Sequence, residues 1–402
     1  MAKKPNIRFA GFEDDWEQRK FSELYAKSSE KNDGSIGMDR NITVATMQFK
    51  EDVKVSTAEY LKTYYTFNLG DIAFEGHQSK EFRYGRFVEN DIGNGIVSHI
   101  FAVFRPIKEF DLQFWKYAIN NEMLMQRILS RSTKASTMMH DLVTEDFLNE
   151  IFLVPSLNEQ KKIGTYLKSI DHLITLHQRK CDELKKVKKF MLQKMFPKKG
   201  EKNPEIRFDG FTNDWEQRKL PEFVSFFNGL TYTPDDVRKT GTLVLRSSNV
   251  KNGEIIDADN VYVSEKVATS ENVQVGDIIV VVRNGSRALI GKHAQIKAFM
   301  PNTVIGAFMS GIRSEHPSFV NALLDTSAFE CEIAKNMGAT INQITGYMFS
   351  KMEFTIPSEE EQKKIGDYFR NLDHIITLHQ RKCEELKNVK KYMLQNMFAK
   401  GE

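Results

Sequence analysis

The chain repeats itself, and this internal repeat limits its possible folds more than any other feature. Residues 5–12 (PNIRFAGF) recur at 204–211 as PEIRFDGF, and both copies continue into the hexapeptide DWEQRK. Residues 155–196 return at 357–398 with about 30 of 42 positions identical. The stretches in between share little beyond a Gly-Asp-Ile tripeptide that begins at Gly70 and at Gly276. A period of about 200 residues is too long for a solenoid. The sequence therefore predicts two tandem modules, each with a variable body followed by a nearly constant segment.

The constant segments predict two long helices. The first one lacks proline, is rich in good helix formers, can be capped by Ser156 or Asn158, and ends before Pro197. Its apolar residues follow alternating steps of three and four, which is the spacing of a heptad seam. The seam residues include Ile163, Leu167, Ile170 and Ile174 in the first copy, and Ile365, Phe369, Leu372 and Ile376 in the second. Each stripe must be buried, and the other helix is the simplest partner. We expect an antiparallel coiled coil about a local two-fold axis, with one body at each end.

The centre of this coil would bring together histidine and cysteine. In a symmetric register His177 lies near Cys383, and Cys181 lies near His379. One interpretation is a His2Cys2 zinc site. The other is a small polar layer that fixes the register of the coil. The sequence lacks the short loop spacing of known zinc motifs, so we favour the polar layer and assign no metal site.

Composition narrows the class of protein. The chain has 57 Lys and Arg against 54 Asp and Glu, and a net charge of +3 is too small to indicate nucleic acid by itself. Three cysteines exclude a disulfide framework and fit a reducing compartment. No apolar run is long enough to span a membrane, and no apolar stretch follows the basic start. We expect a cytoplasmic protein without membrane contacts.

The variable bodies predict mixed α/β structure. A β-branched run over 276–283 and the segment 243–246 predict buried strands, and Asn252-Gly253 is a turn signal. Apolar spacing over 111–130 predicts one amphipathic helix.

Segments in both bodies mix cations, amides and aromatic residues, as in a nucleic-acid surface. They are residues 77–86 and 283–287, followed later by loops 132–137 and 338–343 at corresponding places. Arginine reads guanine, Asn and Gln read adenine, and Lys and Arg hold phosphates. Solvated loops are the alternative. The candidate DNA-contacting residues are Gln78, Lys80, Arg83, Arg86 and Lys134 in the first body, and Arg246, Asn249, Arg283, Asn284, Arg287, Asn342 and Gln343 in the second.

Five common catalytic or cofactor-binding motifs are missing from the sequence. It contains no phosphate-binding P-loop, no Gly-x-Gly-x-x-Gly, no His-Glu-x-x-His and no Gly-x-Ser-x-Gly. The Asn/Asp-Pro-Pro-Tyr/Phe motif that an adenine methyltransferase needs is also missing. We therefore expect a reader or scaffold and name no catalytic residues.

These features together resemble the specificity subunits of type I restriction–modification systems. The resemblance rests on the Glu-Gln-Lys-Lys-Ile-Gly start of each long helix, the Met-Leu-Gln-x-Met-Phe ends and the Asp-Trp-Glu-Gln-Arg-Lys entry to each body. It implies an α+β fold with an internal pseudo-two-fold repeat. Target-recognition domains at 1–155 and 201–357 would alternate with coiled-coil helices at 156–200 and 358–402. Each domain would read one half of a split, asymmetric DNA target, and the helices would set the spacing.

The same resemblance implies partners for the chain. Two modification subunits that bind S-adenosylmethionine would dock on it, and restriction subunits that use ATP and Mg would join them, while this chain carries no cofactor and is not catalytic. The helix ends Met191, Met195, Phe196, Met393, Met397 and Phe398 are candidate docking residues, with ordinary seam packing as the alternative. Two other functions stay open: a DNA nuclease or methyltransferase with duplicated domains, and a coiled-coil scaffold without a DNA role.

Overall fold

A computed structural model describes residues 4–51, 57–136, 139–337 and 342–400. The chain forms two compact units, Met1–Gln178 with Arg381–Glu402, and Arg179–Gln380. We call residues 17–154 body 1 and residues 216–356 body 2. The domain boundaries expected from the sequence stay predictions, since the two units divide each long helix near its middle.

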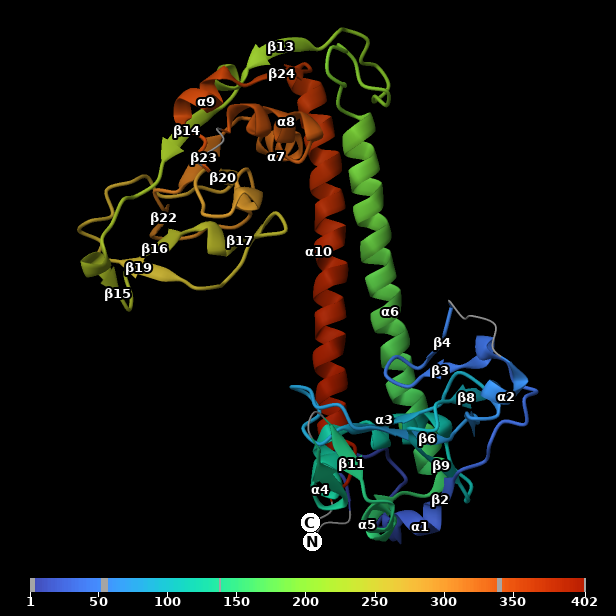
Figure 1. Ribbon diagram of the computed structural model, residues 1–402. Helices are drawn as coiled ribbons and strands as arrows, with labels where there is room; N and C mark the ends of the chain where they lie inside the picture. The colour runs from blue at the N-terminus through green and yellow to red at the C-terminus, as the bar shows by residue number, and fades with distance from the viewer. Residues whose placement is uncertain (1–3, 52–56, 137–138, 338–341, 401–402) are drawn as a thin grey trace. The chain divides into compact units, whose positions relative to one another are not determined.

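Body 1 is built on a four-stranded antiparallel sheet in the order β2-β9-β6-β7. These strands are β2 (Tyr25–Ser28), β9 (Ala102–Pro106), β6 (Ile72–Glu75) and β7 (Arg86–Glu89). Figure 1 labels three of these strands, β2, β9 and β6. The described part of body 1 also contains two-stranded ladders. They pair β1 (Glu17–Lys20) with β12 (Ile151–Val154), β3 (Ile42–Thr43) with β4 (Gln48–Phe49), β5 (Tyr65–Phe67) with β8 (Gly95–Val97), and β10 (Thr133–Ala135) with β11 (His140–Leu142). Its helical segments are α1 (Phe21–Leu24), η1 (Met38–Arg40), α2 (Ala58–Leu61), α3 (Leu112–Ile119), α4 (Glu122–Ser132) and α5 (Thr144–Asn149).

Body 2 repeats this sheet with the order β14-β23-β20-β21. The strands are β14 (Ser225–Asn228), β23 (Met309–Arg313), β20 (Ile278–Val281) and β21 (His293–Gln295). A second four-stranded sheet contains β15 (Val237–Arg238), β19 (Val261–Val263), β16 (Thr242–Leu245) and β22 (Thr303–Ile305), and two ladders pair β13 (Glu216–Lys219) with β24 (Glu353–Ile356) and β17 (Val250–Lys251) with β18 (Glu254–Ile255). The helical segments are η2 (Leu220–Glu222), η3 (Pro234–Asp236), η4 (Ser247–Asn249), η5 (Arg287–Leu289), α7 (Pro317–Leu324), α8 (Ser327–Asn336) and α9 (Gly346–Lys351).

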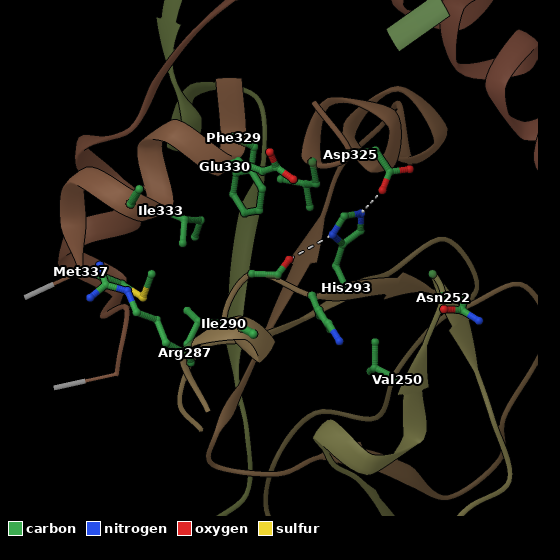
Figure 2. A pocket seen from close by; sticks show the side chains of 16 residues that line it. Val250, Asn252, Arg287, Ile290, His293, Asp325, Phe329, Glu330, Ile333 and Met337 are labelled. Carbon is green, nitrogen blue, oxygen red and sulfur yellow. Dashed lines mark hydrogen bonds and ion pairs between the residues drawn. The ribbon is translucent and has the colours of Figure 1, made fainter. Parts of the chain in front are cut away.

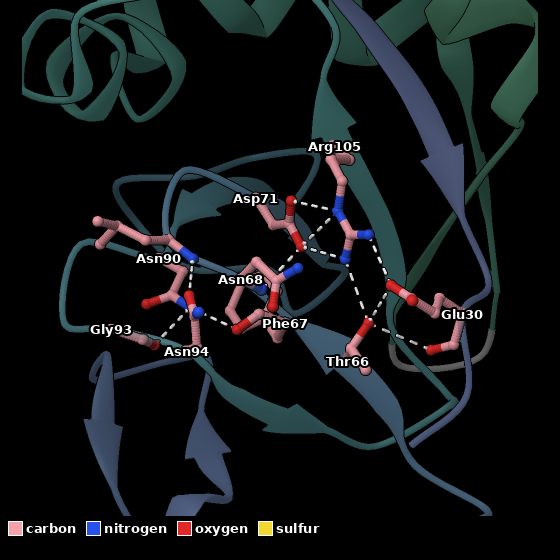
Figure 3. A network of polar contacts seen from close by, with 10 residues as sticks. Glu30, Thr66, Phe67, Asn68, Asp71, Asn90, Gly93, Asn94 and Arg105 are labelled. Atoms are coloured by element: carbon pink, nitrogen blue, oxygen red, sulfur yellow. Dashed lines mark hydrogen bonds and ion pairs between the residues drawn. The ribbon is translucent and has the colours of Figure 1, made fainter. Parts of the chain in front are cut away.

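The short Gly-Asp-Ile repeat has a structural cause. Asp71 is buried at the start of β6 and receives hydrogen bonds from Arg105 of the neighbouring strand (Figure 3). Asp277 is buried in the same place in body 2 and binds Arg313. A buried carboxylate is strongly unfavourable unless it is paired. Both bodies therefore keep this ion pair as the joint between their two central strands.

The other repeated segments also meet in the fold. Arg8, from the first copy of the motif, binds Glu159 through two hydrogen bonds at 2.7 and 2.8 Å, and Arg207 binds Glu361 in the same way. Both glutamates are buried. The repeated lead-in motif is therefore tied to the first turn of each repeated helix, which explains why both segments stay alike while the bodies differ.

Three local predictions for the bodies are confirmed and one is wrong. Strands β20 and β16 lie where they were expected, and Asn252 and Gly253 form the predicted turn with positive φ angles of 54° and 75°. The single helix expected over 111–130 is two helices. It breaks because the side chain of Asn121 accepts a hydrogen bond from the Met123 N–H and starts α4 anew. Asparagine competes with helical hydrogen bonding in this way.

The two long helices are present as predicted. Helices α6 (Leu157–Lys194) and α10 (Glu359–Asn396) have 38 residues each. In the first unit Asp171 of α6 pairs with Lys390 of α10, and in the second Lys188 pairs with Asp373. Both pairs lie within one residue of the register expected from the sequence. Within the first unit, Cys383 also lies beside Gln178, so the parts of α6 and α10 in this unit run antiparallel. No helix in the described ranges is long and apolar enough to cross a membrane.

The apolar stripes are buried, but only their central parts form the helix–helix seam. In the second unit Cys181, Leu372 and Ile376 form a cluster between the helices. The N-terminal thirds of the helices pack elsewhere: Ile163 and Leu167 lie in the core of the first unit, and Ile365 and Phe369 lie in the core of the second. The coiled coil is therefore shorter than the full stripe predicts, because each helix begins as part of its own body.

Both central cysteines of the long helices are buried. The Cys383 Sγ lies 3.8 Å from Gln178 Oε1 and 3.9 Å from the Ile174 carbonyl oxygen. Among the described residues no group of three or more His, Cys, Asp or Glu side chains is placed to hold a metal ion. Polar contacts at this layer are what a register-fixing function requires.

The helix ends are buried in the body cores. Phe398 packs on Phe114 and Trp16 in the first unit, with ring centroids 5.4 and 6.5 Å apart. Phe196 packs on Phe319 and Trp215 in the second unit, at 5.7 and 6.1 Å. Met195 and Met397 are buried beside them, and Met191 and Met393 are half-buried. This burial favours packing over docking for the six predicted docking residues. The packing partner is a body core, however, and not the helix seam that the sequence suggested.

Candidate nucleic-acid interface

In body 2 the predicted segments converge at one end of the central sheet. The backbone leaves β20 at Val281, and Ile344 N–H donates to the Val282 carbonyl at 2.8 Å. A β-bridge joins Arg283 to Gln343, and Asn342 Nδ2 donates to the Gly285 carbonyl at 3.0 Å. Residues 342–344 therefore lie against the loop that follows β20, as the corresponding positions in the sequence suggested. The rest of the 338–343 loop, residues 338–341, lies outside the described residues.

A third segment of body 2 joins this surface through η4. Asn284 Nδ2 donates to Ser247 Oγ at 3.0 Å. Arg246, which precedes η4, is half-buried and pairs with Asp259 Oδ2 at 2.6 Å. Because the Asp259 carboxylate already binds the Arg246 guanidinium, DNA would have to compete with Asp259 for this arginine.

Asn249 has a structural task that the sequence did not reveal. Its side chain is fully buried, accepts a hydrogen bond from Arg246 N–H at 2.9 Å and donates to the Ala258 carbonyl at 2.8 Å and to Asn260 Oδ1 at 2.9 Å. Both amide hydrogens are used and the side chain is fully buried, so it cannot reach a base edge. We therefore leave Asn249 out of the interface proposed below.

Body 1 shows the same convergence with different residues. The His140 N–H donates to the Gly76 carbonyl at 2.8 Å, and a bridge joins His77 to Met139. The β10–β11 hairpin, which carries exposed Lys134, therefore lies against the loop 77–86. Of the 132–137 segment, residue 137 lies outside the described residues.

The predicted arginines of body 1 differ in how firmly they are held. Arg86 pairs with Glu75 at 2.7 Å and lies over the Phe82 ring. Arg83 is exposed, with its guanidinium 5.5 Å from the Tyr84 ring centroid. Its backbone N–H donates to Glu122, and burial raises the pKa of that carboxyl. Arg83 thus extends from a fixed backbone, whereas Arg86 stabilises the base of the loop.

The exposed candidates are the residues whose polar groups are available for contact with DNA. Their side chains can donate to phosphates or to base edges without breaking an ion pair of the described structure. They are Gln78, Lys80, Arg83 and Lys134 in body 1, and Arg283 and Arg287 in body 2, while Asn284, Asn342 and Gln343 are half-buried beside them.

A hollow of about 460 Å³ lies beside the body 2 surface (Figure 2). Arg287, Lys292 and His293 line it together with apolar residues of α8. His293 Nδ1 donates to the Gly291 carbonyl at 3.1 Å, and its Nε2 faces Asp325 at 3.4 Å. Burial by itself would raise the pKa of Asp325, but His293 and Lys188 outweigh it and hold that pKa below its ordinary value. The loop after β20 is thereby connected through His293 and Asp325 to α6.

The long helices expose a second apolar stripe that the sequence analysis missed. Leu173, Leu176, Val389 and Tyr392 are exposed in the first unit, and Ile375, Leu378, Val187 and Phe190 are exposed in the second. Each position has an equivalent in the other helix copy. The sequence shows that these apolar residues repeat, but it does not show that they are exposed. A heptad pattern does not say which of two apolar stripes faces the partner helix.

Comparison with known proteins places the chain in a family. The family model described as the type I restriction modification DNA specificity domain matches twice, at residues 13–186 and 212–388. The chain therefore belongs to the family of DNA specificity subunits of type I restriction–modification systems, and the resemblance seen in the sequence is confirmed.

Individual relatives agree with this assignment. The chain is 26% identical over 300 residues to the type I restriction enzyme MjaVIII specificity subunit of Methanocaldococcus jannaschii, covering 71% of this chain and 69% of that protein. Its fold is similar to the S subunit of a type I system from M. genitalium, with a TM-score of 0.63 at 14% identity over 99% of this chain and 100% of that one. A chain from a structural study of type I complex assembly and conformational transition matches with a TM-score of 0.54 at 15% identity, covering 96% of this chain and 98% of the other. The last two likenesses concern the fold alone.

Proposed function

We propose that each body reads one half of a bipartite, asymmetric DNA target, through the surface where the loop after β6 or β20 meets the segment before the last helix of the body. One observation carries this proposal. Both bodies build this surface on the same sheet scaffold, yet they place different polar and cationic residues on it. Equal scaffolds with unequal contact residues are suited to two unlike half-sites.

In this proposal the chain itself does no chemistry. S-adenosylmethionine would bind to modification subunits, and ATP and Mg to restriction subunits, with this chain supplying the DNA sequence preference. The sequence lacks the corresponding methylation and nucleotide motifs, which supports this division of tasks. A DNA nuclease or methyltransferase acting alone remains the alternative, and purified chain that cuts or methylates DNA without added subunits would favour it.

We assign the docking of two modification subunits to the second apolar stripe of the long helices. Exposed apolar clusters mark protein interfaces more often than isolated residues do. Each of the four exposed residues in the first unit has an equivalent in the second unit. Two identical partners require such a pair of matching surfaces. This assignment replaces the helix ends that the sequence suggested, because most of those are buried.

An exchange of bodies tests the reading of half-sites. Residues 216–352 are replaced by the corresponding body of another family member, and methylated adenines are mapped in cells that contain the modification subunits. We expect one half of the methylated motif to change and the other to stay. The matched exchange of residues 17–150 should change the opposite half. If either exchange alters both halves, the division of reading between the bodies is wrong.

Single substitutions test the docking surface. Phe190→Glu and Tyr392→Glu should weaken copurification of the modification subunit, since each places a charge in an apolar contact. Lys189→Glu serves as the control, because this exposed residue lies about 100° around the helix from Phe190. Equal retention of the partner by all three variants would remove this surface from the proposal.

A further inference from the structure

Sheet register makes two exposed apolar residues equivalent. Ile72 pairs with Phe104 in body 1, and Ile278 pairs with Ile312 in body 2. Four residues before Phe104 and Ile312, just ahead of β9 and β23, lie Ile100 and Phe308. Each is the third residue of a turn that a hydrogen bond closes, from Phe101 N–H to the Ser98 carbonyl and from Met309 N–H to the Gly306 carbonyl. Ile100 is 73% exposed and Phe308 is 55% exposed. The two bodies therefore present a large apolar side chain at the same point, although their sequences around it are unrelated.

The turn that carries Phe308 is held by three neighbouring segments. Gly306 N–H donates to the Leu245 carbonyl and Ala307 N–H to the Leu230 carbonyl, both at 2.9 Å. The Phe308 carbonyl accepts from Val282 N–H at 3.0 Å. These hydrogen bonds fix the backbone of the turn on several sides. The fold itself therefore keeps the Phe308 ring exposed.

The surroundings of Phe308 are those of the proposed DNA surface. The Arg283 guanidinium lies 5.0 Å from the ring centroid, and Arg283 is bridged to Gln343. Cations and amides at this place would bring the DNA backbone and base edges close to the ring. The guanidinium covers one face of the ring, so the ring is not free to be sandwiched between two base pairs.

The turn of Ile100 lies at the corresponding end of body 1. Phe101 N–H closes the turn on the Ser98 carbonyl at 3.1 Å. Ala102, which starts β9, pairs with Phe74 near the end of β6, where the loop 77–86 begins. Ile100, two residues before Ala102, therefore lies at the end of the sheet from which the loop with Gln78, Lys80 and Arg83 starts.

We propose that Ile100 and Phe308 are base-reading residues that contact the 5-methyl group of a thymine in the major groove, one in each half-site. This inference rests on the proposed function and goes further by naming an apolar reader in each body. The thymine methyl is the apolar mark that the major groove offers, and aliphatic and phenyl side chains recognise it. Because Ile100 and Phe308 differ in size, the two bodies would contact a thymine methyl group at different distances from their backbones.

The test uses the full chain with its modification subunits, after the methylated motif of the wild type has been mapped. Phe308→Ala and Ile100→Ala should each relax one base pair of one half-site, with about a tenfold loss of discrimination, the low end of the cost of one wrong base pair. Uracil in place of that thymine should cause the same loss in the wild type and no further loss in the variant. Both side chains are exposed, so the variants should keep the wild-type melting temperature.

Two matched controls are available at the opposite sheet ends. Phe299 is 79% exposed and follows β21 beyond Gln295, which pairs with the first residue of β20. Ile107 is 52% exposed and follows the last residue of β9. Phe299→Ala and Ile107→Ala should leave the motif unchanged.

Several results would overturn the inference. One is an unchanged motif in both Phe308→Ala and Ile100→Ala; another is wild-type binding that ignores uracil at every thymine of the half-sites. A rise in 2-aminopurine fluorescence beside the contact would indicate an unstacking wedge and also contradict a methyl contact. A wild-type chain that yields no bipartite motif at all would instead overturn the proposed function.

Discussion

Lys390 Nζ lies 2.7 Å from Asp171 Oδ1, which joins α10 to α6 in the first unit. The Tyr117 hydroxyl of α3 donates to the other oxygen of Asp171 at 2.6 Å and ties this pair to body 1. The corresponding pair of the second unit, Lys188 with Asp373, has a carboxylate as its third member, Asp325. The repeat has thus kept the pair between the helices and changed the group that the body adds to it.

This difference predicts unequal costs for removing the two lysines. Lys188→Met would leave two partly buried carboxylates facing each other, so we expect a loss of about 3 kcal/mol of unfolding free energy. Lys390→Met should cost about 1 kcal/mol, because Tyr117 still donates to Asp171. Burial already raises the pKa of Asp373, and loss of Lys188 would raise that pKa further.

Thermal denaturation of both variants at neutral pH measures this difference, with Lys189→Met as the exposed control. Adding Asp325→Asn to Lys188→Met should recover part of the loss, since one of the two facing charges is gone. Equal melting temperatures for the two lysine variants would contradict the role of the third group.

Glu89 predicts a pH dependence of stability. It is buried in body 1, neither carboxylate oxygen has a hydrogen-bond partner among the residues that the structure describes, and burial raises its pKa well above the ordinary value. The unfolded chain ionises Glu89 near its ordinary pKa, while the folded chain keeps it protonated to higher pH. Between these two pKa values, stability therefore falls as pH rises, by up to about 1.4 kcal/mol per pH unit.

Glu89→Gln should remove this decline and raise the melting temperature more at pH 8 than at pH 5. The second body supports this choice of residue, because Gln295 occupies the equivalent place: Ile72 pairs with Glu89, and Ile278 pairs with Gln295. Glu81→Gln at an exposed site is the control and should change neither value. A parallel shift at both pH values would mean that Glu89 is ionised in the folded chain.

Replacement of the glycines in the long helices by alanine would gain helix propensity but would cost packing energy. A Cβ on Gly164 would lie 2.6 Å from the Phe114 backbone nitrogen, and one on Gly366 would lie 2.7 Å from that of Phe319. Alanine is favoured over glycine in a helix by about 1 kcal/mol. Overpacking against backbone costs about 1–3 kcal/mol, so Gly164→Ala and Gly366→Ala should both destabilise. Ser169→Ala, at an exposed helical site, should be neutral; a raised melting temperature in either glycine variant would show that the contact relaxes.

The sequence predicted the repeat because whole segments recur, and it predicted the two long helices because a helix depends on local periodicity. The register followed from the symmetry of the repeat. It could not predict that Phe196 and Phe398 enter body cores, since an apolar period shows that a residue is buried but not against what. The same limit applies to Ile163 and Ile365. They were predicted to lie in the helix–helix seam, but they lie in the cores of the two units.

Site residues were harder to predict for a related reason. Asparagine reads adenine and also closes turns, and only the three-dimensional contacts of Asn249 distinguish the two. Phe308 had no signal in the sequence at all, because its equivalence to Ile100 exists only through strand pairing.

Asn249 and Arg287 predict two separable effects on DNA binding. Asn249→Ala removes hydrogen bonds that are fully buried, so it should lower unfolding free energy by about 2–3 kcal/mol and weaken DNA binding together with it. Arg287→Ala, at an exposed site, should keep the melting temperature and reduce the slope of log affinity against log salt by about one, as expected for one lost phosphate contact. Melting curves and gel shifts of the assembled complex at several salt concentrations measure both. If Arg287→Ala leaves affinity and salt slope unchanged, the loop after β20 does not contact phosphate, and the interface of body 2 has to be redrawn around Arg283.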